Sequence, residues 1–175
     1  MRLFVAIKLN DEIKNAVTEL QDRLRENSVR GRYSNVNNLH LTLAFIGEYD
    51  DPNVVMEALE KVRFKSFTLK LNGHIGKFGD VLWTGLEKND DLQNLAEDIR
   101  RSFVENNIPF DKKKYNPHIT MMRKTLYYKD ISEIKADKAE MKVESFVLMC
   151  TLRDKKGVFY REVGVVYSED NQALE

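Results

Sequence analysis

The sequence predicts a mixed fold of strands and helices built as a structural duplication, in which two similar lobes face each other across a groove. The first observation behind this prediction is a repeat. Residues 38–45 contain His40-Leu41-Thr42, and residues 116–123 contain His118-Ile119-Thr120, about 78 positions later. Each copy lies in a short apolar run of the kind that forms a buried strand. The second observation is that a predicted helix precedes each copy.

In the first half of the chain, apolar residues at spacings of three and four predict helices, and short apolar runs predict strands. A polar cap and a proline at the first helical position mark helix starts. The elements expected here are a strand over residues 2–8, a helix from Asn10 or Asp11 to about Glu26, a loop over residues 27–37 with a tight turn at Gly31, the first repeat strand up to about Gly47, and a helix that begins at Asp51-Pro52.

The same patterns continue in the second half, which ends in two long strands. The elements expected here are strands over residues 67–71 and 81–86 with a glycine-rich loop over 73–80 between them, a helix from Asp90-Asp91 to near Asn106, the second repeat strand, a short helix or irregular connection over 127–142, strands over 143–152 and 158–167 joined at 155–157, and a frayed tail over 168–175.

Length and charge limit the classes of function. A chain of 175 residues suits one domain, and we expect residues 1–175 to form a single two-lobed domain. Lys and Arg together number 28, and so do Asp and Glu, which gives zero net charge. Overall charge therefore gives no reason to expect broad, sequence-blind nucleic-acid binding, and any such contact should be local, at an end or a single nucleotide.

The N-terminal apolar run is too short for a signal peptide, and the chain has no stretch of about 18 apolar residues. We therefore expect a cytoplasmic protein with no membrane segment, and we expect it to be a monomer. Cys150 is the only cysteine, so neither a disulfide framework nor a cysteine-rich zinc site is expected. Cys150 itself is expected to be a small buried residue.

The repeat places chemically useful groups on one face of each strand. Side chains alternate along a strand, so His40 and Thr42 point the same way, as do His118 and Thr120. Two imidazoles that converge on one volume can serve as an acid and a base, because imidazole titrates near neutral pH. Such a pair suits displacement at phosphorus, with the hydroxyls donating to phosphate oxygens. A strained cyclic phosphate would lessen the need for a metal.

Each of these residues also has a structural interpretation. A single His in an apolar strand is more often structural than catalytic, and Thr is common in strands; the matched pair favours function. His74 sits in a predicted loop and is expected to be a surface or packing residue. A zinc site made from the three histidines lacks the usual ligand spacing.

Phe45 and Arg123 occupy equivalent places, three residues beyond each Thr. Strict alternation puts both on the face opposite the histidines, so each needs a bend or bulge to reach the groove. The alternatives are core packing or base stacking for Phe45, and a solvated charge or a phosphate clamp for Arg123. Two further sets have weaker alternatives: Phe78 and Trp83 as core or groove residues, and the Lys112–Lys114 run as solvated surface or RNA-steering charge.

At these residues the chain resembles the two-histidine (2H) phosphoesterase superfamily, and within it the RNA 2′,3′-cyclic phosphodiesterases, also described as 2′–5′ RNA ligases. That group is marked by His-x-Thr-x-x-Phe and His-x-Thr-x-x-Arg, which stand here at residues 40–45 and 118–123. The resemblance covers nearly the whole chain. It extends to the opening residues 2–7, the run over 39–47, Phe78-Gly79, Tyr115-Asn116-Pro117-His118 and the closing Gly157-Val158-Phe159-Tyr160.

The resemblance implies a two-lobed α+β fold with antiparallel sheets facing a central groove and helices outside. It implies cofactor-free and metal-free hydrolysis of RNA 2′,3′-cyclic phosphate ends to 2′-phosphomonoesters, with possible reverse ligation. The roles that it implies are general acid for His40, general base for His118, phosphate-oxygen contacts for Thr42 and Thr120, a phosphate brace for Arg123, and base stacking for Phe45. A near-symmetric pair cannot reveal which His is the acid, so that assignment comes from the family alone. Cys150 stands where Ser is common in such proteins.

Other functions remain open at this point. The same scaffold suits another substrate, such as a 2′–5′ linked oligonucleotide or a small cyclic nucleotide. A non-catalytic protein that binds phosphorylated RNA ends is a second alternative, although binding alone would not need two titratable imidazoles. A purely structural protein would require both copies of the motif to be coincidental.

Overall fold

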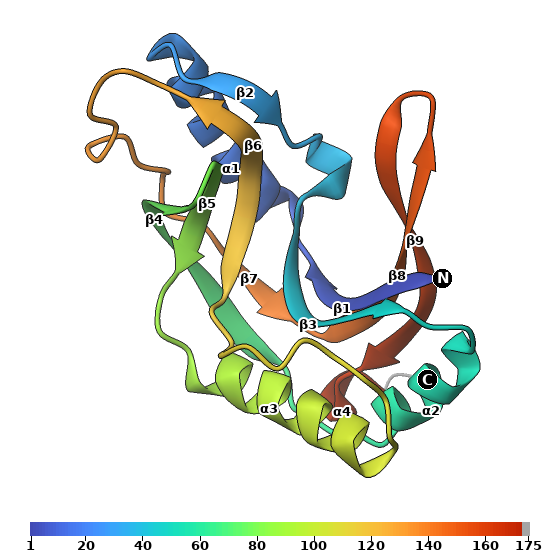
Figure 1. The fold of residues 1–175 in the computed structure, drawn as a ribbon. Helices are drawn as coiled ribbons and strands as arrows, with labels where there is room; N and C mark the ends of the chain where they lie inside the picture. Colours follow the sequence, from blue (N-terminus) through green and yellow to red (C-terminus); the bar gives the residue numbers. More distant parts are fainter. Residues whose placement is uncertain (173–175) are drawn as a thin grey trace.

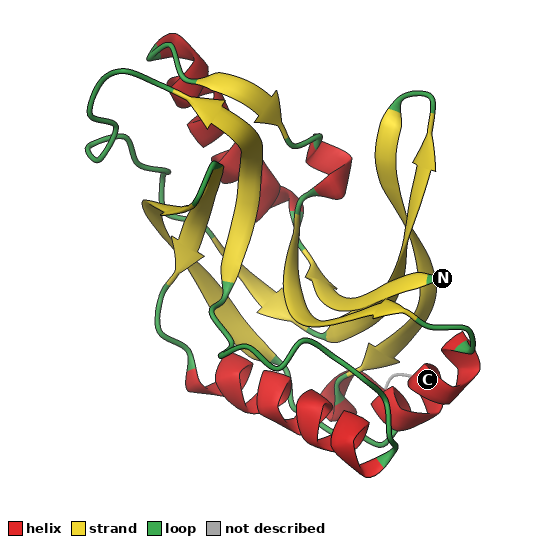
Figure 2. Ribbon diagram, in the orientation of Figure 1, coloured by secondary structure: helices red, strands yellow, loops and turns green. Residues whose placement is uncertain are grey.

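The computed structural model describes residues 1–172, and it places nine strands and four α-helices around two antiparallel sheets (Figures 1 and 2). The strands are β1 (Arg2–Lys8), β2 (Arg30–Tyr33), β3 (His40–Glu48), β4 (Phe67–Phe78), β5 (Val81–Leu86), β6 (His118–Leu126), β7 (Glu140–Val143), β8 (Ser145–Asp154) and β9 (Gly157–Tyr167). The helices are α1 (Asp11–Glu26), α2 (Pro52–Glu60), α3 (Asp90–Glu105) and α4 (Glu169–Gln172), with a 3₁₀ turn η1 (Val36–Asn38).

The two sheets repeat one arrangement of strands. One sheet has the order β3-β1-β8-β9, and the other has the order β6-β5-β4-β7 with β2 added on the outer side of β6. In both sheets a His-x-Thr strand begins the repeated order, and every pairing is antiparallel. The predicted α+β class and the predicted duplication into two lobes are therefore confirmed.

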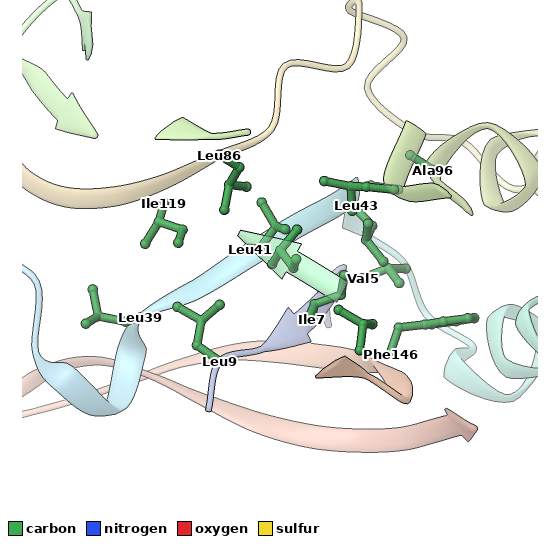
Figure 3. Packing of buried hydrophobic residues seen from close by; sticks show 14 of the residues in the cluster. Val5, Ile7, Leu9, Leu39, Leu41, Leu43, Leu86, Ala96, Ile119 and Phe146 are labelled. Carbon is green, nitrogen blue, oxygen red and sulfur yellow. The ribbon is translucent and has the colours of Figure 1, made fainter. Parts of the chain in front are cut away.

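One apolar cluster lies beneath both sheets and fixes the His-x-Thr strands from behind (Figure 3). Leu41 and Leu43 of β3 and Ile119 and Met121 of β6 have no exposed surface. They alternate with the His and Thr residues, whose side chains are therefore held toward the opposite face. Figure 3 shows Leu41 near Leu86 from the other sheet and Leu43 near Ala96 of α3, and Ile119 belongs to the same cluster.

The helices begin where the sequence predicts. The Asn10 side chain accepts a hydrogen bond from the backbone N–H of Ile13 and caps α1. Asp51 caps α2, whose first residue is Pro52, and Asn89 caps α3. Each cap satisfies a backbone N–H that has no partner within its helix. No helix within residues 1–172 is long and apolar enough to cross a membrane.

Two predicted loops are strands, and glycine explains both corrections. The segment 27–37 contains β2, where Gly31 lies so close to the Arg123 and Lys124 carbonyl oxygens that a Cβ would be 2.8 and 2.9 Å from them. The predicted loop over residues 73–80 is largely the continuation of β4, in which Gly76 lies directly under the Trp83 ring. Glycine therefore marks close packing here rather than a turn.

The last two corrections concern segments of high charge. β7 forms at the end of the predicted connection over 127–142 and extends to Val143, and it pairs with β4. The predicted frayed tail is wrong as far as residue 172: Ser168 is fully buried, and the Asp170 carboxylate accepts hydrogen bonds from Ser66 Oγ and from the Ser66 backbone N–H, 3.0 Å away. Its residues 173–175 lie outside the described part of the chain.

Candidate active site

The two His-x-Thr strands open onto one groove between the lobes, with a volume of about 1490 Å³. β3 and β6 approach each other across the molecule and form part of its walls (Figure 1). All six residues predicted for the site contribute to the lining. They are His40, Thr42, Phe45, His118, Thr120 and Arg123.

A β-bulge follows the first His-x-Thr motif. In the pairing of β1 with β3, Val5 lies opposite Ala44 and Ala6 lies opposite Thr42. Leu43 is therefore an extra residue, and it is buried together with Ala44 instead of alternating with it. A bulge of this kind reverses the facing of the side chains that follow it, here as far as the next register shift, beyond Phe45.

The second motif has a bulge at the equivalent position. In the pairing of β5 with β6, Leu82 lies opposite Met122 and Trp83 lies opposite Thr120, which leaves Met121 as the extra residue. Met121 and Met122 are both fully buried, as their counterparts in the first motif are. The duplication thus extends to an irregularity of the backbone.

The two bulges bring Phe45 and Arg123 to the groove. Strict alternation would have left both on the core face, and after the bulge both line the groove beside the His and Thr residues. Phe45 is partly buried, with the Arg2 guanidinium 4.9 Å from its ring centroid, and Arg123 is exposed. Arg123 makes no ion pair within residues 1–172.

The same backbone contact fixes both imidazoles. His40 Nδ1 lies 2.7 Å from the Asn38 carbonyl oxygen, and His118 Nδ1 lies 2.7 Å from the Asn116 carbonyl oxygen. A carbonyl oxygen only accepts, so each Nδ1 carries a proton and donates it. In both rings Nε2 is consequently the atom that gains or loses a proton.

The His40 ring packs against two aromatic rings and is partly buried. Its ring centroid lies 5.0 Å from that of Phe4 and 5.1 Å from that of Tyr160, and its Nε2 lies 3.1 Å from Thr42 Oγ1. Burial lowers the pKa of His40 below its usual value, and the nearby charges of His118 and Arg123 act in the same direction, against the hydrogen bond to Asn38. Near pH 7 the ring is therefore neutral in the free protein.

His118 has an aromatic pair of its own, but the pair is more open. Its ring centroid lies 5.2 Å from that of Phe78 and 5.8 Å from that of Trp83. Phe78 is 43% exposed, so core packing is the wrong interpretation for it. The Trp83 ring takes up this position because Gly76, without a side chain, leaves room for it. Within residues 1–172 no group forms a hydrogen bond with His118 Nε2.

Basic groups dominate the groove, although the whole chain is neutral. Seven basic side chains line it, and the only acidic side chains of the lining are Glu48, which pairs with the amino terminus at 3.4 Å, and Asp154. None of the seven makes an ion pair within residues 1–172, so their charge is available to an anion. They are Arg2, Arg32, Arg123, Arg153, Lys155, Lys156 and Arg161.

Among the secondary candidates, His74 and the lysine run lie outside the groove, whereas Cys150 belongs to its lining. His74 is exposed on β4, and the Lys112–Lys114 run is exposed and absent from the lining. Cys150 is buried, as predicted. Among the described residues no three His, Cys, Asp or Glu side chains are grouped closely enough to hold a metal ion.

Sequence reasoning missed the residues that hold His40. Phe4 and Tyr160 come from opposite ends of the chain, 36 positions before and 120 positions after that histidine. The family resemblance includes residues 2–7 and 157–160, and that is the only signal in these segments. Nothing in their sequence indicates that Phe4 or Tyr160 contacts an imidazole. Arg32 gave no indication at all, because its strand was predicted to be a loop.

The chain is similar to known proteins over most of its length. A family model described as the 2′-5′ RNA ligase superfamily matches residues 9–155. The chain is similar to a protein of Thermotoga maritima named RNA 2′,3′-cyclic phosphodiesterase, at 31% identity over 92% of each chain. A protein of the same name from Archaeoglobus fulgidus is 28% identical over 94% of this chain and 99% of its own.

Solved structures share the fold. The crystal structure of E. coli LigT in its apo form superposes with a TM-score of 0.80 at 25% identity, covering 95% of this chain and 96% of LigT. The crystal structure of TT0787 from Thermus thermophilus gives a TM-score of 0.81 at 28% identity, covering 97% of this chain and 100% of that chain.

Proposed function

The chain belongs to the 2′-5′ RNA ligase superfamily, and from that premise we propose that it hydrolyses RNA 2′,3′-cyclic phosphate ends to 2′-phosphomonoesters. The observation that carries the proposal is the matched pair of imidazoles, each held by Nδ1 and each contributing to one basic groove. The names of the relatives from Thermotoga maritima and Archaeoglobus fulgidus support the same activity.

In the proposed reaction the cyclic phosphate lies between the two histidines. His118 Nε2 accepts a proton from water as the water oxygen attacks phosphorus. The bond from phosphorus to O3′ breaks, and His40 Nε2 gives its proton to O3′. The product carries a 2′-phosphate and a free 3′-hydroxyl, and proton exchange with solvent restores both imidazoles. Each proton transfer of this kind is worth about 10²–10⁴ in rate.

The remaining site residues stabilise charge or hold the substrate. Thr42 and Thr120 donate hydrogen bonds to the non-bridging phosphate oxygens, where negative charge grows during the attack. Arg123 braces the phosphate with its planar guanidinium, which fits two oxygens at once. Phe45 stacks on the terminal base. The strained ring lessens the need for a Lewis acid, and we include no metal or cofactor in the reaction.

The assignment of His40 as the acid sets a condition on its protonation. Burial lowers the pKa of His40, so the free protein holds its ring neutral near pH 7. The acid must carry a proton when the substrate is bound. An anionic cyclic phosphate beside the ring favours the charged form and opposes the effect of burial. We therefore propose that substrate binding itself brings His40 into its acidic form.

We also propose that residues 1–175 act as one catalytic domain and as a monomer that binds RNA at its end. Two features support this. A single apolar cluster lies beneath both sheets, and residues from both lobes of one chain line the groove. The site therefore needs no residue from a second copy.

The test is incubation of the purified protein, in the presence of EDTA, with a short RNA that carries a 2′,3′-cyclic phosphate. We expect a 2′-phosphate product from the wild type and no turnover from His40→Ala or His118→Ala. A 3′-phosphate product would mean that O2′ leaves instead. Absence of turnover with retained binding of the RNA end would support a non-catalytic binder and contradict the proposal.

A further inference from the structure

The tip of the β8–β9 hairpin extends beyond the sheet to which it belongs. β8 pairs with β1 only from Val147 to Thr151, whereas its pairing with β9 continues to Asp154 and Gly157. Residues 152–159, here called the arm, thus form a two-stranded ribbon that pairs with no third strand and projects beside the groove (Figure 1). A ribbon with no third strand gains little stability from its own pairing.

The arm carries charge that nothing in the described chain neutralises. Arg153, Lys155 and Lys156 are exposed, line the groove and make no ion pair within residues 1–172. The turn is well formed, because Asp154 Oδ1 accepts the Lys156 backbone N–H at 2.8 Å. Because the Asp154 carboxylate accepts this hydrogen bond within the turn, it does not pair with the side chain of Lys155 or Lys156. Both lysine side chains therefore remain available to a ligand.

An aromatic ring lies among these charges. Phe159, from the strand of the arm opposite Leu152, is 40% exposed and lines the groove. Arg32 and Tyr33 of β2 also line the groove, and β2 lies on the other side of the molecule from the arm (Figure 1). Cationic side chains interspersed with accessible aromatic rings are the combination that binds single-stranded nucleic acid, since the charges follow the phosphates and the rings stack on bases.

The arm is joined near its tip to η1, the turn that leads into the strand of His40. Asn38 Nδ2 donates to the Val158 carbonyl oxygen at 2.9 Å, and the Asn38 carbonyl accepts the proton on His40 Nδ1. The Asn116 carbonyl oxygen accepts the proton on His118 Nδ1 in the same way, but the Asn116 side chain makes no hydrogen bond within residues 1–172. Only the first lobe therefore joins its histidine to the arm.

We propose that the arm binds the sugar–phosphate backbone of the single-stranded RNA that leads to the reacting end. This inference rests on the proposed function, because a cyclic phosphate held between the histidines is the 3′ end of a chain that must leave the groove. The arm and the lining residues of β2 extend the groove beyond the histidines. The substrate class is accordingly an RNA strand of several nucleotides rather than a cyclic mononucleotide, and recognition along the arm is independent of sequence.

The test compares Lys155→Ala/Lys156→Ala with Lys112→Ala/Lys114→Ala. The second variant removes the same charge from an exposed segment outside the groove. Two substrates are used, a dinucleotide and a decanucleotide, each with a 5′ fluorophore and a 2′,3′-cyclic phosphate. Hydrolysis is followed for both, and fluorescence anisotropy of a decanucleotide ending in a 3′-hydroxyl measures binding without turnover. Melting temperatures confirm that all variants are folded.

We expect the wild type to prefer the decanucleotide. The arm variant should bind the decanucleotide about tenfold more weakly near 0.1 M salt, and it should lose more activity on the decanucleotide than on the dinucleotide. The slope of log affinity against log salt should fall by about 0.7 for each phosphate that the arm no longer neutralises. The control variant should match the wild type in both assays.

Three results overturn the inference: a wild type without length preference, an arm variant that binds the decanucleotide as well as the wild type does, or a control variant that binds it as weakly as the arm variant. The proposed function fails separately. If no form hydrolyses either RNA but the arm variant alone loses binding, the arm stands and the chemistry does not. If the dinucleotide is hydrolysed with no preference for length, the chemistry stands and the arm does not.

Discussion

The two histidines occupy the same position in repeated strands, yet their surroundings differ. Both donate from Nδ1 to a carbonyl oxygen two residues earlier, and both lie against two aromatic rings. His40 is enclosed by Phe4 and Tyr160, and its Nε2 already has Thr42 as a partner. His118 Nε2 has none within residues 1–172, and the Phe78 side chain beside it is 43% exposed.

This difference fits the two roles that we propose for the histidines. A base that activates water needs access to water and a free lone pair, which the surroundings of His118 provide. An acid that protonates a leaving oxygen benefits from a site that excludes water and holds the ring in one orientation, as the surroundings of His40 do. The symmetric backbone sets the two imidazoles in place, and the side chains from β1, β9 and β4 make them unequal.

Removal of either imidazole gives the largest expected effect. His40→Ala and His118→Ala should each lower kcat for a cyclic-phosphate RNA by about 10²–10⁴, because each deletes one proton transfer. Steady-state kinetics measures the loss, and circular dichroism shows whether the fold is kept. His74→Ala, which changes an exposed residue outside the groove, is the control and should keep full activity. A single histidine variant that retained wild-type kcat would refute the two-residue mechanism.

Replacement of Arg123 is expected to have the next largest effect. Arg123→Ala should lower kcat/KM by about 10²-fold, because it removes a charge-assisted hydrogen bond to the phosphate. Arg123→Lys should recover only part of the loss, since a point charge cannot contact two oxygens in the same plane. Kinetics of both variants on one substrate makes the comparison. Full recovery by lysine would show that Arg123 acts through its charge alone.

Tyr115 links the two motifs, and its loss should reduce stability. Its hydroxyl donates to the Thr42 carbonyl oxygen at 2.8 Å, from a position three residues before His118. Tyr115→Phe keeps the ring and leaves that carbonyl without its partner, which should cost about 1–3 kcal/mol of unfolding free energy. Urea denaturation measures the change. Tyr128→Phe, at a side chain that is 91% exposed, should cost nothing.

The smallest expected effect is a shift of one pKa. Tyr160→Ala should open the His40 ring to water and raise its pKa toward the usual value, because burial is the main cause of the lowering. Tyr160→Phe keeps the ring and should leave the His40 pKa low. NMR titration of the imidazole protons gives both values in the free protein. A low pKa in both variants would mean that Tyr160 does not provide the burial.

The sequence predicted the secondary structure correctly where apolar residues recur at the spacing of a helix or a strand. Strands β1, β5 and β6 and all three long helices follow apolar patterns and caps that are local in the chain. β2 was missed because Arg-Gly-Arg-Tyr has no apolar alternation, and its place depends on a glycine that fits against the β6 backbone. Local patterns cannot reveal such packing between distant segments.

The same limit applies to the site. Both His-x-Thr pairs are evident from their spacing, and the sequence predicts that Phe45 and Arg123 require a bulge without showing where it lies. The bulged residues Leu43 and Met121 are known only from the strand pairing. Lys155 and Lys156 are recognisable as a turn, but their place beside the groove depends on how far β8 extends beyond β1.

The division of labour between the histidines can be tested with a substrate in which sulfur replaces O3′ in the cyclic phosphate. A thiolate leaves without protonation, so a missing acid matters little and a missing base matters as before. The account predicts that His40→Ala hydrolyses the sulfur substrate within about tenfold of the wild type, while His118→Ala remains inactive on both substrates. Rescue of His118→Ala and not of His40→Ala would contradict the assignment and reverse the two roles.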